Sequence, residues 1–299
     1  MITPARSLDP IRDQIAEVFR RVLTGGTDAT PVTTWVSDDP DDDGLYGPDS
    51  AAWRVHGELA TLVGGLRALL LQTLHPLAMA GVAQHSAYRS DPFGRLQRTA
   101  GFLAAGIFGT TADATAAIAT VRRVHERVRG TAPDGRSYSA SDPHLITFVH
   151  VTEVDSFLRA HQAFSSDPLS DRDADRYVAE MADLARRLGG EDVPDDVASL
   201  LAWLEHVQPE LTFGTDARQA VRFLLNPPLP LYARPAYGLV VASAVGLLPF
   251  WAQRMLWLPA LPPVDRLAVR PAMRSILAVL GWAIGDPPHK DAARQRTSP

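Results

Sequence analysis

The sequence predicts an all-α protein, and three observations support this prediction. Apolar residues recur with helical periodicity through most of the 299 residues. No convincing run of alternating β-branched residues is bounded by hairpin turns. Apolar residues make up 46% and charged residues 21% of the chain, which is ordinary globular composition. We therefore expect a single large helical domain.

The N-terminal part predicts one short helix and one acidic loop. The helix is expected near residues 10–23, and residues 37–48 form a turn-rich run of aspartate, proline and glycine. This run lacks the glutamate that closes an EF-hand calcium loop, so we interpret it as a solvated loop without a metal. Residues 1–49 are thus expected to precede a helical domain that spans residues 50–285.

Residues 50–89 predict a long apolar helical stretch that is interrupted at His75-Pro76. Proline lacks a backbone donor and clashes with the preceding turn, so the helix should kink or split there. Asp142-Pro143 is typical of an N-cap followed by a proline at the first helical position. The further expected elements are helices at 91–108, 109–130, 142–164, 171–188, 195–207 and 216–224, and a turn at 133–136.

The last third contains a strongly apolar stretch, residues 237–261, which Pro249 and Pro259 interrupt. Its uninterrupted length before Pro249 is too short to span a bilayer. Buried helices are the favoured interpretation, and peripheral membrane contact through residues 237–261 is the alternative. Residues 286–299 are expected to form a disordered tail.

Charge and cysteine content exclude several classes of protein. The net charge is −5, the pI is about 6.0, and Lys290 is the single lysine, which argues against a nucleic-acid partner. The absence of cysteine excludes disulfides, thiolate metal sites, iron–sulfur clusters and covalent haem attachment. No apolar stretch follows the first residues as in a secretory signal, so a cytoplasmic location is expected.

His125 is the most informative polar residue in the predicted core. Ile118, Val121, His125 and Val128 follow the spacing that forms one stripe on a helix. A lone histidine on an apolar face is more often a satisfied core residue than a ligand. The residues alone therefore leave both interpretations of His125 open.

Other polar residues also interrupt apolar segments. His75 could satisfy the carbonyl that the following proline frees, or it could be a polar group in a ligand pocket. Arg95 and Thr99 are four residues apart on one helical face, where they could anchor an anionic group such as a propionate. Arg95 could equally pair with a surface carboxylate. His150 and Glu153 are further polar residues in an apolar segment, and His150 would reach the same helical interior as the residues above if the helices pack antiparallel.

The common catalytic motifs are missing from the sequence. No Glu-x-x-His pair supports a di-iron bundle, and His-Glu-x-x-His, Gly-x-Ser-x-Gly and a Gly-rich nucleotide loop are all absent. A helical interior that carries histidines, an arginine and many apolar residues suits a non-covalent haem with one axial histidine. The same composition also suits other apolar ligands.

An ordered set of short motifs resembles a known family. The set comprises Trp53-Arg-Val-His-Gly-Glu58, Leu69-Leu-Leu-Gln-Thr-Leu-His-Pro76, Gln84-His-Ser86, Asp91-Pro-Phe-Gly-Arg95, Arg98-Thr99, Val124-His125 and Asp142-Pro143. Over about residues 50–164, and more weakly to 271, the chain resembles the mpaB/rubber oxygenase (latex clearing protein) catalytic domain family. The resemblance implies a globin-like helical core that surrounds a buried pocket for haem b. It also implies that His125 is the proximal iron ligand and that Arg95 and Thr99 lie beside the haem.

The leading hypothesis is therefore a haem b-dependent oxygenase that uses dioxygen on a hydrophobic small molecule, such as an unsaturated isoprenoid or a lipid-like compound. His125 would hold the iron, and Arg95, Thr99 and His150 would contact the cofactor. His75 would be the catalytic group that donates a hydrogen bond to bound dioxygen or moves a proton.

Two alternatives remain at this point. Rubber-cleaving members of the family have a distal lysine and a proposed glutamate base, but no lysine precedes Lys290 here. A non-catalytic carrier or sensor that binds haem or lipid is therefore the second hypothesis. The third is a haem-free metal site formed by His75, His125 and His150, for which no carboxylate is suitably spaced to complete a facial triad.

Overall fold

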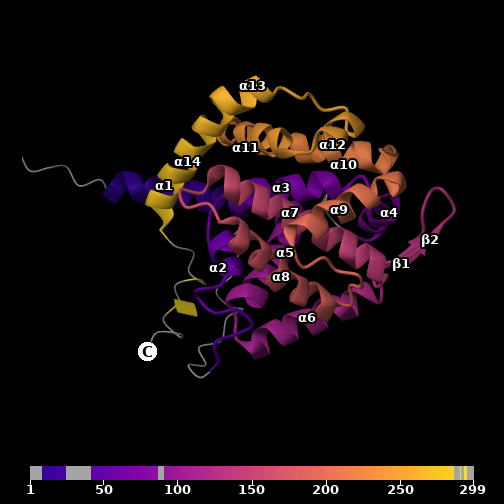
Figure 1. Cartoon of the computed structure of the whole chain (residues 1–299). Coiled ribbons are helices and arrows are strands. Elements are labelled where there is room, and N and C mark those ends of the chain that lie inside the picture. Colours follow the sequence, from indigo (N-terminus) through magenta and orange to yellow (C-terminus); the bar gives the residue numbers. More distant parts are fainter. Residues whose placement is uncertain (1–8, 25–41, 87–90, 286–289, 291–292, 295–299) are drawn as a thin grey trace, which may run out of the picture.

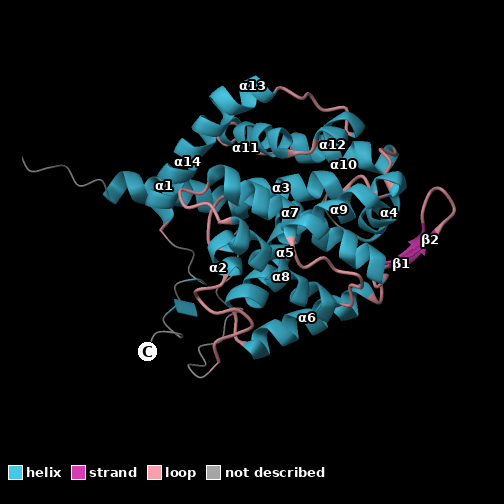
Figure 2. Ribbon diagram, viewed as in Figure 1, coloured by secondary structure: helices cyan, strands magenta, loops and turns pink. Residues whose placement is uncertain are grey.

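A computed structural model describes residues 9–24, 42–86, 91–285, 290 and 293–294, and most of these residues are helical (Figure 2). The all-α prediction is confirmed. In chain order the elements are α1 (Asp9–Thr24), α2 (Ala51–His56), α3 (Thr61–Gln72), α4 (Pro76–His85), α5 (Pro92–Phe108), α6 (Thr111–His125), β1 (Arg129–Thr131), β2 (Ser137–Ser139), α7 (Pro143–Phe164), α8 (Asp171–Leu188), α9 (Val197–His206), the 3₁₀ turn η2 (Gln208–Glu210), α10 (Thr215–Leu225), α11 (Arg234–Leu247), α12 (Phe250–Met255), α13 (Pro262–Val264), the π-helical turn η3 (Asp265–Val269) and α14 (Arg270–Ile284).

Helices α3 and α7 pack against each other at the centre of the molecule (Figure 1). Their close approach depends on Gly64, because a Cβ atom there would lie 2.8 Å from Cδ1 and 3.0 Å from Cα of Phe157. Helices α11 and α14 cover one side of this pair, whereas α8 packs on α7 from the other side and contacts α6. Helix α7 therefore contributes to the packing of both layers.

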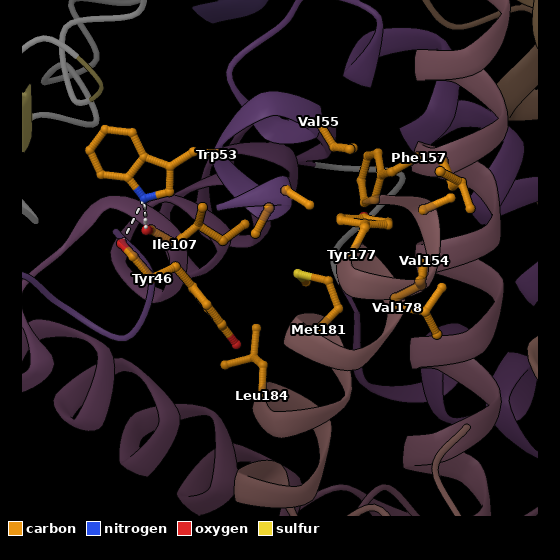
Figure 3. Close-up of a cluster of buried hydrophobic side chains, with 14 of the residues drawn as sticks. Tyr46, Trp53, Val55, Ile107, Val154, Phe157, Tyr177, Val178, Met181 and Leu184 are labelled. Carbon is orange, nitrogen blue, oxygen red and sulfur yellow. Dashed lines mark hydrogen bonds between the residues drawn. The ribbon is translucent and has the colours of Figure 1, made fainter. Parts of the chain in front are cut away.

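A large hydrophobic cluster that includes Trp53 fills the space between α2, α5, α7 and α8 (Figure 3). The Trp53 indole is 2% exposed, and its Nε1 donates hydrogen bonds of 2.9 Å to the carbonyls of Tyr46 and Ile107. A buried indole N–H normally requires such a partner. The bond to Ile107 fixes α2 against the C-terminal end of α5, and the bond to Tyr46 joins α2 to the segment that precedes it.

The predicted break at His75-Pro76 is present. Helix α3 ends at Gln72, α4 begins at Pro76, and the axes of the two helices differ by 106°. His75 is the N-cap of α4, with an extended backbone, and proline occupies the first turn. The proline thus ends one helix and begins the next, as its fixed φ and missing donor predict.

The structure differs from the sequence prediction after His125. The expected helix over 109–130 ends at His125, and β1 pairs with β2 in a short antiparallel hairpin. Gly135 has φ of +88° in the predicted turn, which favours glycine. A Cβ atom at Gly130 would lie 2.7 Å from the hydroxyl of Tyr138, so this glycine permits strand contact and is not a helix cap. Helix α6 is therefore shorter than the helix that the sequence periodicity predicts.

The apolar stretch at 237–261 forms α11 and α12, with the break at Pro249. Burial in this part of the molecule is incomplete, because Trp257 is 71% and Leu267 81% exposed. The segment Pro262–Ile284, which the sequence analysis did not assign, is long and apolar enough to cross a membrane, and only 17% of its most apolar window is buried. The bent pair α3–α4 passes the same test of length and composition.

The two ends of the described chain pack onto the helical body. Helix α1 contacts α14 and α5 (Figure 1). Residues 37–41 of the predicted acidic loop and most of the predicted tail, 286–299, lie outside the described residues. Within the described part of that tail, Lys290 Nζ lies 3.4 Å from the carbonyl of Gly57 and donates to it, and Ala293 is buried. The predicted domain boundaries stay predictions.

Candidate functional site

The candidate site follows one face of α7. Ile146, His150 and Glu153 are spaced by four and three residues, which places them on the same side of a helix. Helices α5, α6 and α8 supply the residues near this face. The site therefore extends along α7, and a cavity lies beside the first turns of this helix.

The cavity lies where the C-terminal end of α6 meets α7 and α8. Its volume is about 240 Å³. A hydrogen bond of 3.3 Å from Arg122 Nη1 to the carbonyl of Arg187 joins α6 to α8 at this place. The residues that line the cavity are Arg122, His125, Glu126, Ser141, Ile146, Leu188 and Gly189.

His125 is the last residue of α6 and lines the cavity. Thr110 and Asp113 form a capping box at its start, and Ile118 is buried in the predicted stripe. The Nδ1 atom of His125 is buried and has no hydrogen-bond partner among the described residues. Burial lowers the pKa of His125, which favours the neutral imidazole. A neutral ring with a free nitrogen is the form that ligates a metal.

His150 lies one turn along α7 from Ile146 and is 7% exposed. Its Nε2 atom is buried and likewise lacks a hydrogen-bond partner in the described part of the chain. Burial lowers the pKa of His150 to about 3, and the positive charge of Arg186 on α8 adds to this effect. The structure thus places a second neutral imidazole on α7, one turn from Ile146 in the cavity wall. The predicted contact of His150 with a cofactor stays a prediction.

Glu153 is the next polar residue on this face. Its Oε1 accepts a hydrogen bond of 3.4 Å from Gln72 Nε2 on α3. Burial raises the pKa of Glu153 to about 7, although the Gln72 hydrogen bond and the charge of Arg95 lower it. This carboxyl group can therefore gain or lose a proton near neutral pH. In the sequence, Glu153 is recognisable only as a polar residue in an apolar segment, because its raised pKa depends on residues from α3 and α5.

Arg95 and Thr99 occupy different environments on α5. Arg95 is partly buried and close enough to Glu153 to affect its pKa. Thr99 is exposed, and its hydroxyl donates a 3.2 Å hydrogen bond to the carbonyl of Arg95. Arg95 thus belongs to the interior face, while Thr99 uses its hydroxyl within its own helix. Their predicted contact with a cofactor stays a prediction.

His75 lies on another side of α7. It is 1% exposed, its ring centroid lies 4.8 Å from that of Phe148, and its Nε2 lies 3.5 Å from Oε2 of Glu210. Phe148 and Ile146 are two residues apart and so point in nearly opposite directions from the helix axis. His75 and His125 therefore pack on different faces of α7. The catalytic role of His75 stays a prediction.

A further buried polar group lies deeper between α2, α7 and α8. His56 Nε2 and the hydroxyl of Tyr177 are 3.0 Å apart, and His161 Nδ1 lies 3.4 Å from Oε2 of Glu58. Burial and, to a smaller degree, the charge of Glu153 raise the pKa of Tyr177. No spacing in the sequence indicated this group, because its members come from separate segments.

The residues at the cavity fit one end of a haem site. The unpartnered nitrogen of His125 could serve as an axial ligand, Arg122 could pair with a propionate, and Ile146 and Leu188 are apolar walls. Pockets that enclose a drug-sized ligand usually have volumes of roughly 300–1,000 Å³. The cavity of about 240 Å³ is smaller, so haem binding requires an exposed edge of the haem or a wider gap between α6 and α7.

Comparison with known proteins identifies the family. Residues 53–282 match the family described as ER-bound oxygenase mpaB/B′/rubber oxygenase, catalytic domain. This match covers more than half of the chain, so the protein belongs to this family of oxygenase catalytic domains, and the resemblance inferred from its motifs is confirmed.

Two curated relatives are uncharacterized proteins of Mycobacterium bovis and Mycobacterium tuberculosis. Each is 35% identical to this chain over 98 residues, which cover 33% of this chain and 36% of the relative. The chain therefore aligns with little more than a third of each relative's length. No solved structure matches it.

Proposed function

We propose that this protein is a haem b-dependent oxygenase that uses dioxygen to oxidise a hydrophobic small molecule. The observation that carries the proposal is the buried Nδ1 of His125, which has no hydrogen-bond partner among the described residues and lies beside a cavity with both apolar and charged walls. Buried polar atoms normally have a partner, so an orphaned imidazole nitrogen at a cavity favours a missing ligand. The family supplies the reaction class, and the haem and the substrate class are the proposed parts.

Bound haem would supply the iron that binds and activates dioxygen. The residues of this chain would hold the group and control its surroundings. His125 would hold the iron through its imidazole in the neutral form, which burial favours. His150, which burial also keeps neutral, would provide a second imidazole on α7, one turn from Ile146. Ile146 and Leu188 would exclude water from the apolar side of the pocket.

Proton transfer would depend on Glu153. Its carboxyl group holds a proton up to about pH 7 and lies on the same face of α7 as His150. The hydrogen bond from Gln72 fixes its orientation. The sequence prediction assigned the proton-transfer role to His75, but the contacts of Glu153 with the site face support it better. A titrating interior carboxyl also favours an enzyme over a carrier, since a carrier needs no group that exchanges protons near neutral pH.

The first experiment asks whether haem binds through His125. The chain is expressed with haem supplied, and the absorbance of wild type, His125→Ala and the surface control His206→Ala is recorded. We expect a Soret band in wild type and His206→Ala, and a strongly diminished band in His125→Ala. Equal bands in all three proteins would contradict the role of His125, and no band in any of them would contradict haem binding.

The second experiment distinguishes the enzyme from a carrier. Oxygen consumption by the haem-loaded protein is measured with an unsaturated isoprenoid and with an unsaturated fatty acid, and products are identified by mass spectrometry. Substrate-dependent oxygen uptake with an oxygenated product supports the oxygenase. Stable binding of both compounds without oxygen uptake would support the haem or lipid carrier instead.

The exposed apolar surface supports a location at a membrane, which we include in the proposal. Large apolar side chains are exposed on the segment from α12 to α14, which we call the C-terminal layer. Arg254 and Arg266 of the same layer are also exposed and could meet anionic headgroups. The sequence prediction placed this contact at 237–261, whereas the exposed surface extends through α14. Its members include Phe250, Trp257, Leu261, Val264, Leu267 and Trp282.

A further inference from the structure

Three side chains that the proposed haem chemistry does not use meet near the N-terminal end of α7. They are His75 at the N-cap of α4, His144 in the first turn of α7, and Glu210 at the end of η2. One ligand atom from each lies within 4.8 Å of the other two. The carboxylate is 66 residues from His144, so no sequence motif could indicate this group.

The distances match those of a small metal centre. Nε2 of His75 lies 3.5 Å and Nε2 of His144 lies 3.0 Å from the same carboxylate oxygen, Oε2 of Glu210. Two ligands about 2.0–2.1 Å from a zinc ion lie roughly 3.3 Å apart at the tetrahedral angle. Both histidine–glutamate spacings thus suit one ion, and the two imidazole nitrogens lie within 4.8 Å of each other.

A second observation is independent of this spacing. His75 is 1% exposed, and its Nε2 makes no well-formed hydrogen bond among the described residues, because its contact with Glu210 Oε2 is 3.5 Å long. A buried imidazole nitrogen without a partner costs free energy unless something binds it. Ligation by a metal would remove this cost, whereas the existing contact between His144 and Glu210 does not.

The backbone keeps the three ligands in place without a metal. The amide of Thr212 donates a 2.8 Å hydrogen bond to the carbonyl of Leu74, which joins the segment after η2 to the residue before His75. Asp142 caps the helix that carries His144, and the ring of Trp203 packs 5.4 Å from the His144 ring. Such support is needed for a preformed metal site.

The surrounding charge permits a divalent cation. When they ligate a metal, two imidazoles and one carboxylate together carry a charge of −1. Arg136 is near enough to His75 and Glu210 to add positive charge at the site. Its Nη2 and Nε atoms, however, donate hydrogen bonds of 2.7 and 2.9 Å to Oδ2 of Asp134. The added positive charge is thereby largely offset.

From these observations we infer that His75, His144 and Glu210 form a binding site for a divalent transition-metal ion, separate from His125. Two imidazoles and a carboxylate are a donor set for zinc or ferrous iron and not for calcium or magnesium, which prefer oxygen. His144 is 46% and Glu210 39% exposed, so the remaining coordination positions face solvent. Metal binding at Nε2 would move the ring proton to Nδ1 and so give up only the long, 3.5 Å hydrogen bond that Nδ1 accepts from the Ala78 amide.

This site supplies the carboxylate that the sequence analysis did not find. The third hypothesis grouped His75 with His125 and His150 and lacked a carboxylate ligand. The structure instead places His75 with His144 and Glu210, on a different face of α7 from the other two histidines. A haem at His125 and a metal ion at His75 can therefore be tested separately.

Zinc is the probe for this site. The purified full-length protein is dialysed against a chelator and titrated with Zn²⁺ by calorimetry, and the bound metal is counted by mass spectrometry. His144→Gln and Glu210→Gln remove exposed ligands without opening the core. His206→Gln and Glu205→Gln on α9 remove exposed residues of the same types and serve as matched controls.

We expect one Zn²⁺ per chain in wild type and in both controls, with a Kd at least about tenfold weaker in each ligand variant. Zn²⁺ should also raise the Tm of wild type more than that of His144→Gln. His75→Gln, which alters a buried residue, is compared only if its Tm without zinc is close to that of wild type. Equal zinc affinity in His144→Gln and wild type, or no stoichiometric binding to wild type, would overturn the inference.

Discussion

Replacement of Glu153 by glutamine should stabilise the protein at alkaline pH and leave it nearly unchanged at acid pH. Glutamine has almost the same shape as the protonated glutamic acid and can still accept the hydrogen bond from Gln72. The change therefore removes the titration of Glu153 with little change in packing. Its effect on stability reports the cost of ionising this carboxyl group inside the fold.

The magnitude follows from the shifted pKa. Burial raises the pKa of Glu153 from 4.5 to about 7, so the folded protein binds a proton that the unfolded chain releases. Stability therefore falls as pH rises from about 4.5 and reaches its full loss above about 7. Each pKa unit is worth about 1.4 kcal/mol, which gives a loss of about 3 kcal/mol at pH 8.5.

Urea unfolding of wild type, Glu153→Gln and the surface control Glu205→Gln at pH 4.5, 6.5 and 8.5 measures this loss. The difference between Glu153→Gln and wild type should grow from near zero at pH 4.5 to about 3 kcal/mol at pH 8.5. The control should differ from wild type by less than about 0.5 kcal/mol throughout. A difference that does not change with pH, or a glutamine variant that is less stable at pH 8.5, would refute the reasoning.

Two other changes test the core and the surface. Asp155→Asn should lower the free energy of unfolding by about 3–5 kcal/mol, because it leaves the charge of Arg67 buried without its 2.6 Å partner; a loss below 1 kcal/mol in urea unfolding would contradict this. Leu267→Asp should reduce binding to anionic vesicles in a flotation assay, because Leu267 is 81% exposed on the C-terminal layer. Val124→Asp, on exposed α6, is its control and should bind like wild type, and equal binding by all three proteins would exclude this surface as the membrane contact.

The sequence predicted the helices wherever local signals decide them. The cap at Asp142 and the break at His75-Pro76 are short-range effects of hydrogen bonding and proline geometry, and the structure contains both. The helix end after His125 was misplaced because Gly130 looked like a cap. Its partner in the hairpin, Tyr138, is identified only by pairing with a later strand.

The candidate site was predictable only in part. Helical periodicity placed His125 on an apolar helix face, and the family motifs singled it out, whereas the position of His150 depended on how the helices pack. The raised pKa of Glu153 could not be predicted, because it depends on contacts from α3 and α5. Glu210 was missed for the same reason, since only the folded chain brings it to His75.

The most direct test of the central claim is restoration of the haem ligand from solution. His125→Gly is expressed with haem, and its Soret band is recorded with and without added imidazole, beside wild type and His206→Gly. We predict that the variant has a weak or shifted band, that imidazole restores the wild-type band, and that His206→Gly resembles wild type throughout. A wild-type band in His125→Gly without imidazole would contradict the claim that His125 holds the iron.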